Sequence, residues 1–250
     1  MPLEGCYDTQ PHLRIERDYD ALSKAGAALV AEFFSAKPDA AVVVATGPMG
    51  LYRELAAAYA SGAFDSGRLT VFQLDAYLGL SAKDPRSLYR WTETAFLTPL
   101  GIAPRQLVRL PGDSPDPQAA CRAYDRAVER AGGFDLAILG LGPNGHIGFN
   151  EPPSPPTAKT RVVSLSEASL ESNARYWGGR ERVPRRALTA GMDVLLAAKT
   201  TVLLVSGAHK REVLQSALRG SLTPDVPASY LRAASNVTVF ADRAAWSGRG

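Results

Sequence analysis

Residues 40–55 read AAVVVATGPMGLYREL, a run of alanine and valine followed by Thr46-Gly47-Pro48 and then by apolar residues at helical spacing. The apolar run has the length and the β-branched content of a buried strand. Glycine and proline mark a turn, and Pro48 is well placed near the start of a helix. The stretch therefore predicts a strand, a tight turn and a helix in that order.

The same alternation continues along the chain. Apolar runs with β-branched residues occur at residues 40–46, 69–74, 106–110, 134–141, 200–207 and 236–242. Stretches with helical spacing lie between most of them, at residues 18–34, 51–60, 86–97, 117–131 and 210–218. Strands that are apolar on both faces and alternate with helices are typical of a parallel sheet covered on both sides. We predict one α/β domain over residues 1–250 with a mostly parallel central sheet.

Composition and charge fit a folded, globular protein. The 250 residues are 46% hydrophobic and 21% charged, and 28 Lys and Arg residues against 25 Asp and Glu residues give a net charge of +3. This balance gives no support for a nucleic-acid partner; the basic and aromatic cluster at residues 175–186 is more typical of a solvated loop than of an RNA-binding patch. No apolar run approaches the roughly 20 residues of a membrane span, and the N-terminus lacks a secretory pattern. We expect a cytoplasmic protein with no membrane contact.

Cysteine and histidine usage indicates neither disulfides nor a metal site. Cys6 and Cys121 lack the spacing of metal ligands or of a disulfide scaffold, so we expect reduced thiols. The three histidines are scattered, which argues against a zinc site. Residues 164–183 are polar and aromatic, contain Gly178-Gly179 and interrupt the alternation. We predict a flexible lid there, because such loops often gate sites on α/β sheets.

Polar residues at the ends of the predicted strands are the candidates for chemistry, because ligands of open α/β sheets bind beyond the carboxyl ends of the strands. Thr46 and Gly47 precede a helix whose N-terminal amides favour a phosphate, although an ordinary tight turn explains the same residues. Asp75 follows the strand at 69–74. It either caps the next turn or acts as a general base, a role favoured when burial lifts its pKa toward neutrality.

The stretch GLGPNGHIGFNEP, residues 140–152, follows the fourth apolar run. Its glycines permit a tight turn that aims His146 at a pocket. Glu151 can accept a hydrogen bond from one imidazole nitrogen and fix the tautomer, which suits proton transfer near neutral pH. The alternative is a histidine buried in the core. Lys210, at a later strand-to-helix turn, either faces a phosphate or is solvated.

Taken together, these stretches resemble the glucosamine-6-phosphate deaminase family, which is related to the 6-phosphogluconolactonases. The resemblance covers nearly the whole chain and is carried, in order, by ATG with LYREL, FQLDAYLGL, GLGPNGHIGFNEP, KTR, SNARYW, RALTAGMDVLLAAK and VSGAHKREVL. It implies a three-layer α/β/α, Rossmann-like fold, in agreement with the alternation above. GHIGFNEP points to the deaminases, because lactonases usually continue differently after the histidine.

The resemblance also implies a reaction. Family members convert an amino-sugar phosphate into fructose 6-phosphate and ammonia without a metal or an organic cofactor. By resemblance, Asp75 is the base that moves the C2 proton toward C1, and His146, supported by Glu151, assists ring opening. Such an intermediate needs a base on one face of the opened sugar and an anchor that orients it.

Four further residues match family positions that bind the substrate phosphate. Thr46 and Gly47 begin the phosphate loop of the family, and Arg175 and Lys210 match positions that hold the phosphate itself. The resemblance therefore implies an amino-sugar phosphate as the small-molecule partner. Because oligomers are common in the family, a homo-oligomer is also expected.

Three departures from the family pattern lead to alternative hypotheses. Asn144 stands where the family has an aspartate that can stabilise an imidazolium, the loop after Gly47 is shorter and lacks a threonine, and Ala76 replaces a common acidic residue. The leading hypothesis is an aldose–ketose type reaction on an amino-sugar phosphate, either the deamination itself or an isomerisation that keeps the nitrogen, in an enzyme of this family or one repurposed to a related amino sugar. One alternative is a catalytically silent sugar-phosphate-binding protein. Another is a 6-phosphogluconolactonase-like hydrolase, in which His146 activates water.

Overall fold

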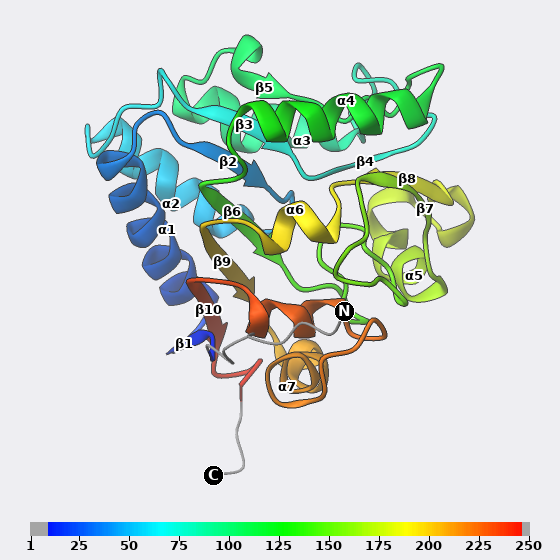
Figure 1. The fold of residues 1–250 in the computed structure, drawn as a ribbon. Coiled ribbons are helices and arrows are strands. Elements are labelled where there is room, and N and C mark those ends of the chain that lie inside the picture. Colours follow the sequence, from blue (N-terminus) through cyan, green and yellow to red (C-terminus); the bar gives the residue numbers. More distant parts are fainter. Residues whose placement is uncertain (1–9, 247–250) are drawn as a thin grey trace.

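A seven-stranded sheet with only parallel pairings forms the centre of the computed structural model, which describes residues 10–246 (Figure 1). The order across the sheet is β1-β10-β9-β6-β2-β3-β5. These strands are β1 (His12–Glu16), β2 (Ala41–Val44), β3 (Thr70–Gln73), β5 (Leu107–Val108), β6 (Leu136–Gly140), β9 (Thr200–Val205) and β10 (Val237–Asp242). Six of them fall within the predicted runs. The edge strand β1 was not predicted.

Both faces of the sheet are covered by helices, because alternate strand residues point to opposite sides. In β2, Ala41 and Val43 belong to one apolar cluster, and Val42 and Val44 belong to the other. The first cluster includes residues of α4 (Pro117–Arg130), α6 (Met192–Leu196) and α7 (Arg211–Arg219), and the second includes residues of α1 (Tyr19–Ala36) and α2 (Met49–Ala60). The predicted three-layer α/β/α fold with a parallel central sheet is confirmed.

A second, three-stranded antiparallel sheet was missed by the sequence analysis. It consists of β4 (Asp75–Tyr77), β8 (Arg186–Thr189) and β7 (Arg161–Ser164), in that order. These strands read DAY, RALT and RVVS, which form no continuous apolar run, and their pairing depends on contacts distant in sequence. The chain passes from the large sheet to the small one at Leu74, between β3 and β4.

The predicted lid segment, residues 164–183, is not a loop in the structure. It contains the end of β7, helix α5 (Glu167–Trp177) and a 3-10 turn (Arg180–Arg182). Leu170 and Trp177 of α5 are buried in a third apolar cluster together with Tyr77 of β4 and Phe149. The segment is therefore anchored against the small sheet, and its movement as a lid stays a prediction.

The predicted helix at 86–97 is also divided. It forms α3 (Leu88–Thr92) followed by a π-helical turn (Glu93–Leu97), whose Phe96 and Leu97 are buried in the cluster of α1 and α2. Both of these side chains thus pack into this cluster. Trp91 of α3 instead lines a cavity at the carboxyl ends of the central strands. Helix α3 therefore borders the candidate site.

The order of the strands creates a crevice between β2 and β6. The chain leaves β2 toward β3 on one side, whereas it leaves β6 toward β9 on the other side. At such a switch point the connections diverge above the carboxyl ends of the two strands, and ligands of open α/β sheets bind there. The predicted site residues that follow β2, β3 and β6 therefore meet at one edge of the sheet.

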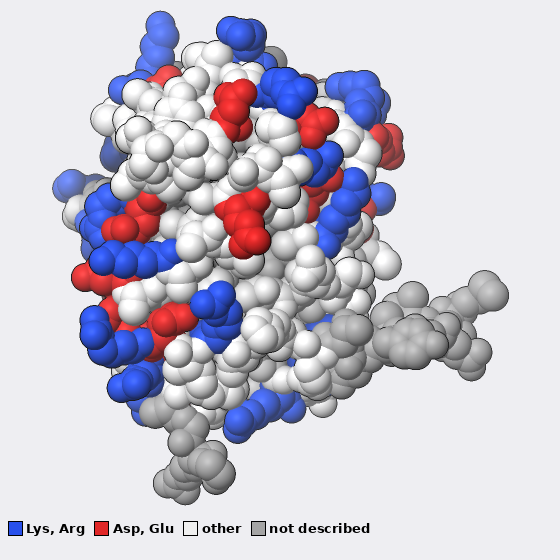
Figure 2. Space-filling view, turned by 90° about the vertical axis from the view of Figure 1, so that its left-hand side faces the viewer, with Lys and Arg blue, Asp and Glu red and all other residues white. Residues whose placement is uncertain are grey.

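Charged side chains of both signs are interspersed on the face shown in Figure 2. In the basic cluster at 175–186, Arg180 forms an ion pair with Glu167, and Arg182 lies 3.8 Å from Glu181. These pairings do not favour the RNA-binding interpretation of the cluster.

The structure can be compared with the expectations about membrane spans and cysteines only within the described residues. Within residues 10–246, no helix is both long and apolar enough to cross a membrane. Cys121 is a free, buried thiol, and burial raises its pKa to about 11. The expectation for Cys6 lies outside the described residues.

A buried carboxylate, that of Asp135, joins three elements at the amino-terminal edge of the sheet. It accepts hydrogen bonds from the backbone N–H of Ala41 (2.9 Å) and from Lys199 Nζ (2.8 Å), and Lys37 Nζ lies 3.6 Å away. Burial alone would raise the pKa of Asp135, but these donors outweigh burial and lower it. The ionised form therefore stabilises the packing of β2 beside β6.

We predict that Asp135→Asn lowers the free energy of unfolding by about 1–3 kcal/mol at pH 7, because a buried charge-assisted contact is lost. A carboxyl whose pKa is lower in the folded chain stabilises the fold above its unfolded pKa, and this contribution disappears as the pH falls. The difference from the wild type should therefore shrink below about pH 4. Urea unfolding from pH 3 to 8 measures it, with the exposed Asp113→Asn as the control. An equal loss at every pH would contradict the assignment.

Candidate active site

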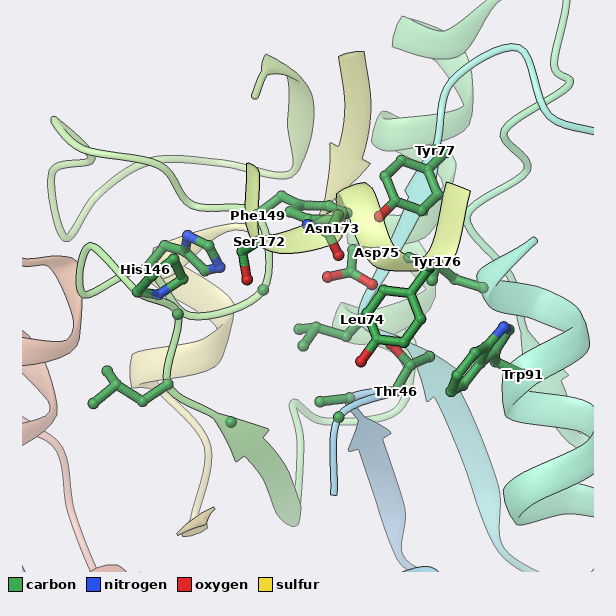
Figure 3. Close-up of a pocket in the computed structure, with 18 of the residues that line it drawn as sticks. Thr46, Leu74, Asp75, Tyr77, Trp91, His146, Phe149, Ser172, Asn173 and Tyr176 are labelled. Atoms are coloured by element: carbon green, nitrogen blue, oxygen red, sulfur yellow. The ribbon is translucent and has the colours of Figure 1, made fainter. Parts of the chain in front are cut away.

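A cavity of about 440 Å³ lies at the carboxyl ends of β2, β3 and β6 (Figure 3). Six of the eight predicted site residues line it: Thr46, Gly47, Asp75, His146, Arg175 and Lys210. The remaining two, Asn144 and Glu151, are not among the lining residues and contact His146 from the loop around it. The structure therefore brings all eight predicted residues together.

Asp75 is held at the junction of the two sheets. Its backbone carbonyl accepts a hydrogen bond from Gln73 Nε2 (2.8 Å), and it lies opposite Thr189 in the pairing of β4 with β8. Its side chain is 8% exposed, and burial raises its pKa to about 7. Within residues 10–246, no hydrogen bond to its carboxylate oxygens is found. A carboxylate with this pKa and free oxygens suits a general base near neutral pH.

His146 is placed by a tight turn after β6. The N–H of Gly142 donates to the carbonyl of His146 (2.9 Å), and the N–H of Gly145 donates to the carbonyl of Gly142 (3.2 Å). Gly145 adopts a φ of 85°, which favours glycine. The imidazole lies against Gly142, since an ideal Cβ there would be 2.2 Å from Nε2. Two glycines thus aim the ring at the cavity from a different side than Asp75 (Figure 3).

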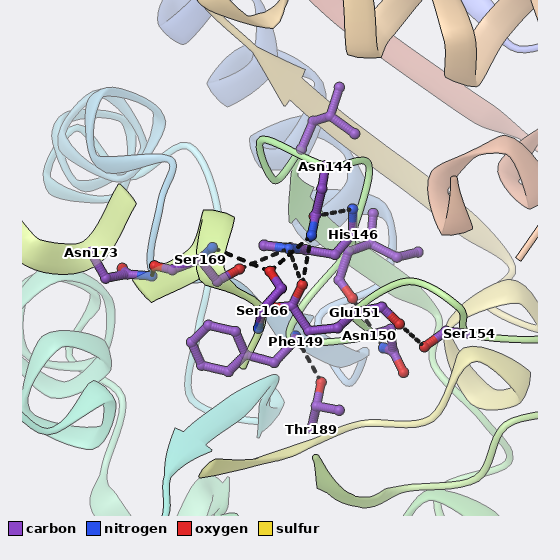
Figure 4. Close-up of polar contacts among 12 residues, drawn as sticks. Asn144, His146, Phe149, Asn150, Glu151, Ser154, Ser166, Ser169, Asn173 and Thr189 are labelled. Carbon is purple, nitrogen blue, oxygen red and sulfur yellow. Dashed lines mark hydrogen bonds and ion pairs between the residues drawn. The ribbon is translucent and has the colours of Figure 1, made fainter. Parts of the chain in front are cut away.

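Glu151 supplies the carboxylate behind the imidazole. Its Oε2 lies 3.4 Å from His146 Nδ1 and accepts a hydrogen bond from Asn144 Nδ2 (2.8 Å) (Figure 4). Burial alone would raise the pKa of Glu151, but the hydrogen bond and charge of His146, with hydrogen bonds from Asn144 and Ser169, lower it to about 2. Glu151 is therefore ionised throughout the neutral range, unlike Asp75.

The carboxylate partner of His146 is thus Glu151, while the side chain of Asn144 supports the pair. Besides its bond to Glu151, Asn144 Nδ2 donates to Ser166 Oγ (3.0 Å), and its Oδ1 accepts from the backbone N–H of His146 (3.4 Å). An ionised aspartate could not make the donor contact to Glu151. The amide therefore fits this arrangement, although sequence reasoning treated it as a weakness.

The backbone around Glu151 is fixed by a separate set of polar contacts. Arg161 donates to Asn150 Oδ1 (2.7 Å) and to Ser154 Oγ (2.7 Å), and the Ser154 hydroxyl in turn donates to the carbonyl of Glu151 (2.5 Å). Asn150 Nδ2 also donates to the carbonyl of Ala190 at the end of β8 (2.9 Å). The loop that carries the carboxylate is thereby tied to the small sheet.

The cationic side chains of Lys210 and Arg175 line the same cavity. Lys210 Nζ donates to the carbonyl of Leu141 (2.7 Å), and its pKa is lowered by burial and by repulsion from Arg175. Arg175 donates to Tyr176 Oη (2.7 Å), and its guanidinium stacks 4.6 Å from the centre of that ring. Two neighbouring cations repel each other, and an anion bound between them would relieve this cost.

The Thr46-Gly47 turn lies at the same end of β2. Pro48 is the N-cap of α2, so the helix begins at Met49, two residues after Gly47. The N–H of Met49 is bonded to the carbonyl of Gly47 (2.9 Å), and that of Gly50 to Tyr19 Oη (2.8 Å). Two amide groups of the first turn are therefore already used, which leaves side chains as the main anion ligands.

Several residues that line the cavity were missed by sequence reasoning. They are Tyr77, Arg86, Trp91, Asn173, Tyr176 and Trp177. The rings of Trp91 and Tyr176 pack edge to face at 5.7 Å, and those of Tyr77 and Trp177 at 5.2 Å. Isolated aromatic residues resemble core residues in a sequence, so no pattern identified them. Across residues 10–246, no group of three or more His, Cys, Asp and Glu residues is arranged to hold a metal ion.

Comparisons with known proteins agree with this geometry. The family profile described as glucosamine-6-phosphate isomerases/6-phosphogluconolactonase matches residues 17–240. Glucosamine-6-phosphate deaminase 2 of Bacillus subtilis is 41% identical, with 91% of this chain and 93% of the relative covered. The glucosamine-6-phosphate deaminase of Halothermothrix orenii is 38% identical, with 93% and 98% covered.

Solved structures give the same result. A monomeric glucosamine-6-phosphate deaminase superposes with a TM-score of 0.91 at 37% identity, covering 94% of this chain and 98% of that one. The 6-phosphogluconolactonase of Trypanosoma brucei has a TM-score of 0.74 at 19% identity, covering 95% and 98%, which shows a shared fold. With this fold, this site and this extent of identity, the chain belongs to the glucosamine-6-phosphate isomerase/6-phosphogluconolactonase family.

Proposed function

We propose that the chain is a glucosamine-6-phosphate deaminase, which converts glucosamine 6-phosphate and water into fructose 6-phosphate and ammonia. The observation that carries this proposal is the free, buried carboxylate of Asp75, with a pKa of about 7, in the same cavity as the ion pair of His146 and Glu151. The identity of 34–41% to proteins named glucosamine-6-phosphate deaminase supports it.

Ring opening is the first step. The bond between C1 and the ring oxygen breaks, the ring oxygen takes up a proton, and the hydroxyl on C1 loses one as C1 becomes an aldehyde. His146 lines the cavity, and its Nε2, which lies next to Gly142 and away from Glu151, can carry the proton between these oxygens. Glu151, on the Nδ1 side, holds the ring in place.

Proton transfer between carbons follows. Asp75 removes the C2 proton while the C1 oxygen takes up a proton, which gives an enolamine. Asp75 then returns its proton to C1, and the nitrogen gives up a proton as the imine forms at C2. Water adds to the imine carbon, and the C2–N bond breaks with release of ammonia and formation of the ketone. Asp75 ends the cycle ionised, and no oxidant or reductant is needed.

The phosphate of the substrate would be bound by Lys210 and Arg175, with Thr46 and Gly47 at the end of β2. This arrangement separates the anchor from the reacting carbons, as positioning catalysis requires. Arg175 is bonded to Tyr176 in the structure, so it must exchange this contact for one with phosphate.

A lactone hydrolase is less well supported. Hydrolysis needs a base that activates water, and it gives no role to a second carboxylate with a pKa near neutrality. The lactonase structures match at about 17–20% identity, which reflects the fold alone. A silent binding protein is disfavoured because Asp75, His146 and Glu151 are all present and assembled.

All eight predicted site residues come together within a single chain. The relative with a TM-score of 0.91 is described as monomeric. We propose that a single chain is active, so the homo-oligomer expected from the resemblance is not required for catalysis.

The proposed function predicts the fate of the C2 proton. With glucosamine 6-phosphate in heavy water, proton NMR should show loss of the H2 signal together with fructose 6-phosphate and ammonia. Asp75→Asn should abolish both changes, because an amide cannot take up the proton. Formation of ketose at the wild-type rate by Asp75→Asn would contradict the assigned base. An untouched substrate at high wild-type concentration would reject the deaminase, and 6-phosphogluconolactone then tests the alternative.

The raised pKa of Asp75 predicts a specific pH dependence. The base must be ionised, so kcat/KM should fall about tenfold per pH unit below about pH 7 and be level above it. The substrate phosphate also ionises near pH 6 and contributes to the rate profile, so carbon NMR titration of Asp75 should confirm its pKa independently.

The raised pKa of Asp75 also has a consequence for stability. The folded chain binds the Asp75 proton more tightly than the unfolded chain, so ionisation destabilises the fold as the pH rises. Asp75→Asn should therefore be more stable than the wild type at pH 8, by roughly 1–4 kcal/mol.

The anion site is tested by Lys210→Met, which keeps much of the apolar stem and removes the charge. We expect kcat/KM for glucosamine 6-phosphate to fall about 10- to 100-fold, because a hydrogen bond to a charged group contributes about 1.5–3 kcal/mol. Inorganic phosphate should also become a weaker competitive inhibitor. The exposed Lys24→Met on α1 is the matched control. Unchanged inhibition by phosphate would place the anion elsewhere.

A further inference from the structure

The inner nitrogen of His146 has two partners at equal distance. Its Nδ1 lies 3.4 Å from Glu151 Oε2 and 3.4 Å from Ser169 Oγ (Figure 4). Both distances exceed the roughly 2.7–2.9 Å of a tight charge-assisted hydrogen bond. Glu151 alone therefore does not fix the ring, and a second group is in place to share this nitrogen.

Ser169 is fully buried in the first turn of α5. Its backbone N–H donates to Ser166 Oγ (3.2 Å), and its carbonyl accepts from Asn173 Nδ2 (2.8 Å). Serine hydroxyls inside helices usually bond to a carbonyl of the preceding turn. Among the described residues no such bond is found for Ser169, whose hydroxyl faces His146 instead. A buried hydroxyl left without a partner would carry a cost, so this contact satisfies it.

The start of α5 is fixed on the same carboxylate. The backbone N–H of Ser166 donates to Glu151 Oε1 (3.3 Å), and Ser166 Oγ accepts a hydrogen bond from Asn144 Nδ2 (3.0 Å). Ser166 is also the N-cap of α5. The position of Ser169 relative to His146 is therefore set by contacts that hold Glu151, and not by the helix alone.

We propose that Ser169 is a positioning residue for His146, whose hydroxyl accepts the Nδ1 proton and donates its own proton toward Glu151. This bridge holds the imidazole in the tautomer with hydrogen on Nδ1 and leaves Nε2 without hydrogen, on the edge of the ring next to Gly142, which also lines the cavity. The inference rests on the ring-opening role proposed for His146. No sequence pattern singled out Ser169.

The bridge predicts which step depends on Ser169. In ring opening, Nε2 takes a proton from one sugar oxygen and gives it to another. In the other tautomer Nε2 already carries the hydrogen, so it cannot accept the proton from the sugar. Transfer of the C2 proton is carried out by Asp75, which lies on β4 and does not contact Ser169 in any described interaction. Loss of the hydroxyl should therefore slow ring opening and leave the carbon step unchanged.

The test compares Ser169→Ala with the wild type in the full-length chain. We expect kcat to fall about tenfold, because part of the acid–base contribution is lost, while KM changes less than about threefold. With glucosamine 6-phosphate deuterated at C2, the primary isotope effect should fall toward unity, because ring opening becomes rate-limiting. Ser169→Thr, which keeps the hydroxyl, should recover most of the activity. Ser164→Ala, exposed at the end of β7, is the matched control.

A second measurement does not require turnover. Nitrogen-15 NMR of the imidazoles, assigned with His12→Gln and His209→Gln, should show the Nδ1-protonated tautomer of neutral His146 in the wild type and a mixture in Ser169→Ala. An unchanged tautomer, or wild-type kcat together with an undiminished isotope effect, would overturn the inference. If the wild type itself makes no ketose, the proposed function fails, and the tautomer still decides the role of Ser169.

Discussion

The buried carboxylate of Glu151 is the constraint on which the site depends. An ionised carboxylate removed from water must be surrounded by donors, or it becomes neutral. Here the donors come from Asn144 and His146 of its own loop and from the start of α5 at Ser166. Satisfying one charge therefore places the histidine and also docks the helix that carries Arg175 toward the cavity.

The two carboxylates of the site are shifted in opposite directions by their surroundings. Asp75 has no donor within the described chain, so burial raises its pKa, whereas the donors around Glu151 outweigh burial and lower its pKa. A fold can thus keep one carboxylate ready to take a proton and the other permanently ionised, and this separation is typical of acid–base assignments in active sites. The pKa of Asp75 is raised because Asp75 is buried beside Leu74, where the chain passes from one sheet to the other.

Much of the fold could be predicted from the sequence, because strands such as those at 41–44 and 200–205 lie in continuous apolar runs and are buried on both faces. The small sheet could not, since its strands DAY, RALT and RVVS lie in no continuous apolar run and β4 pairs with a segment more than 100 residues away. Of the site, Asp75 and His146 are marked by their place after strands and by neighbouring glycines. Arg175 and Lys210 were assigned through the resemblance, and Ser169 is recognisable only when α5 is docked.

Asn144 illustrates why a single position cannot be interpreted without its neighbours. From the sequence, the loss of an aspartate next to His146 indicates a weaker partner for the imidazolium. In the structure that partner is Glu151, and Asn144 contributes a donor 2.8 Å from its carboxylate. An aspartate at 144 would place a second negative charge against Glu151, and two such carboxylates tend to share a proton. The amide instead keeps one full negative charge behind the imidazole, as the proposed role of His146 in ring opening requires.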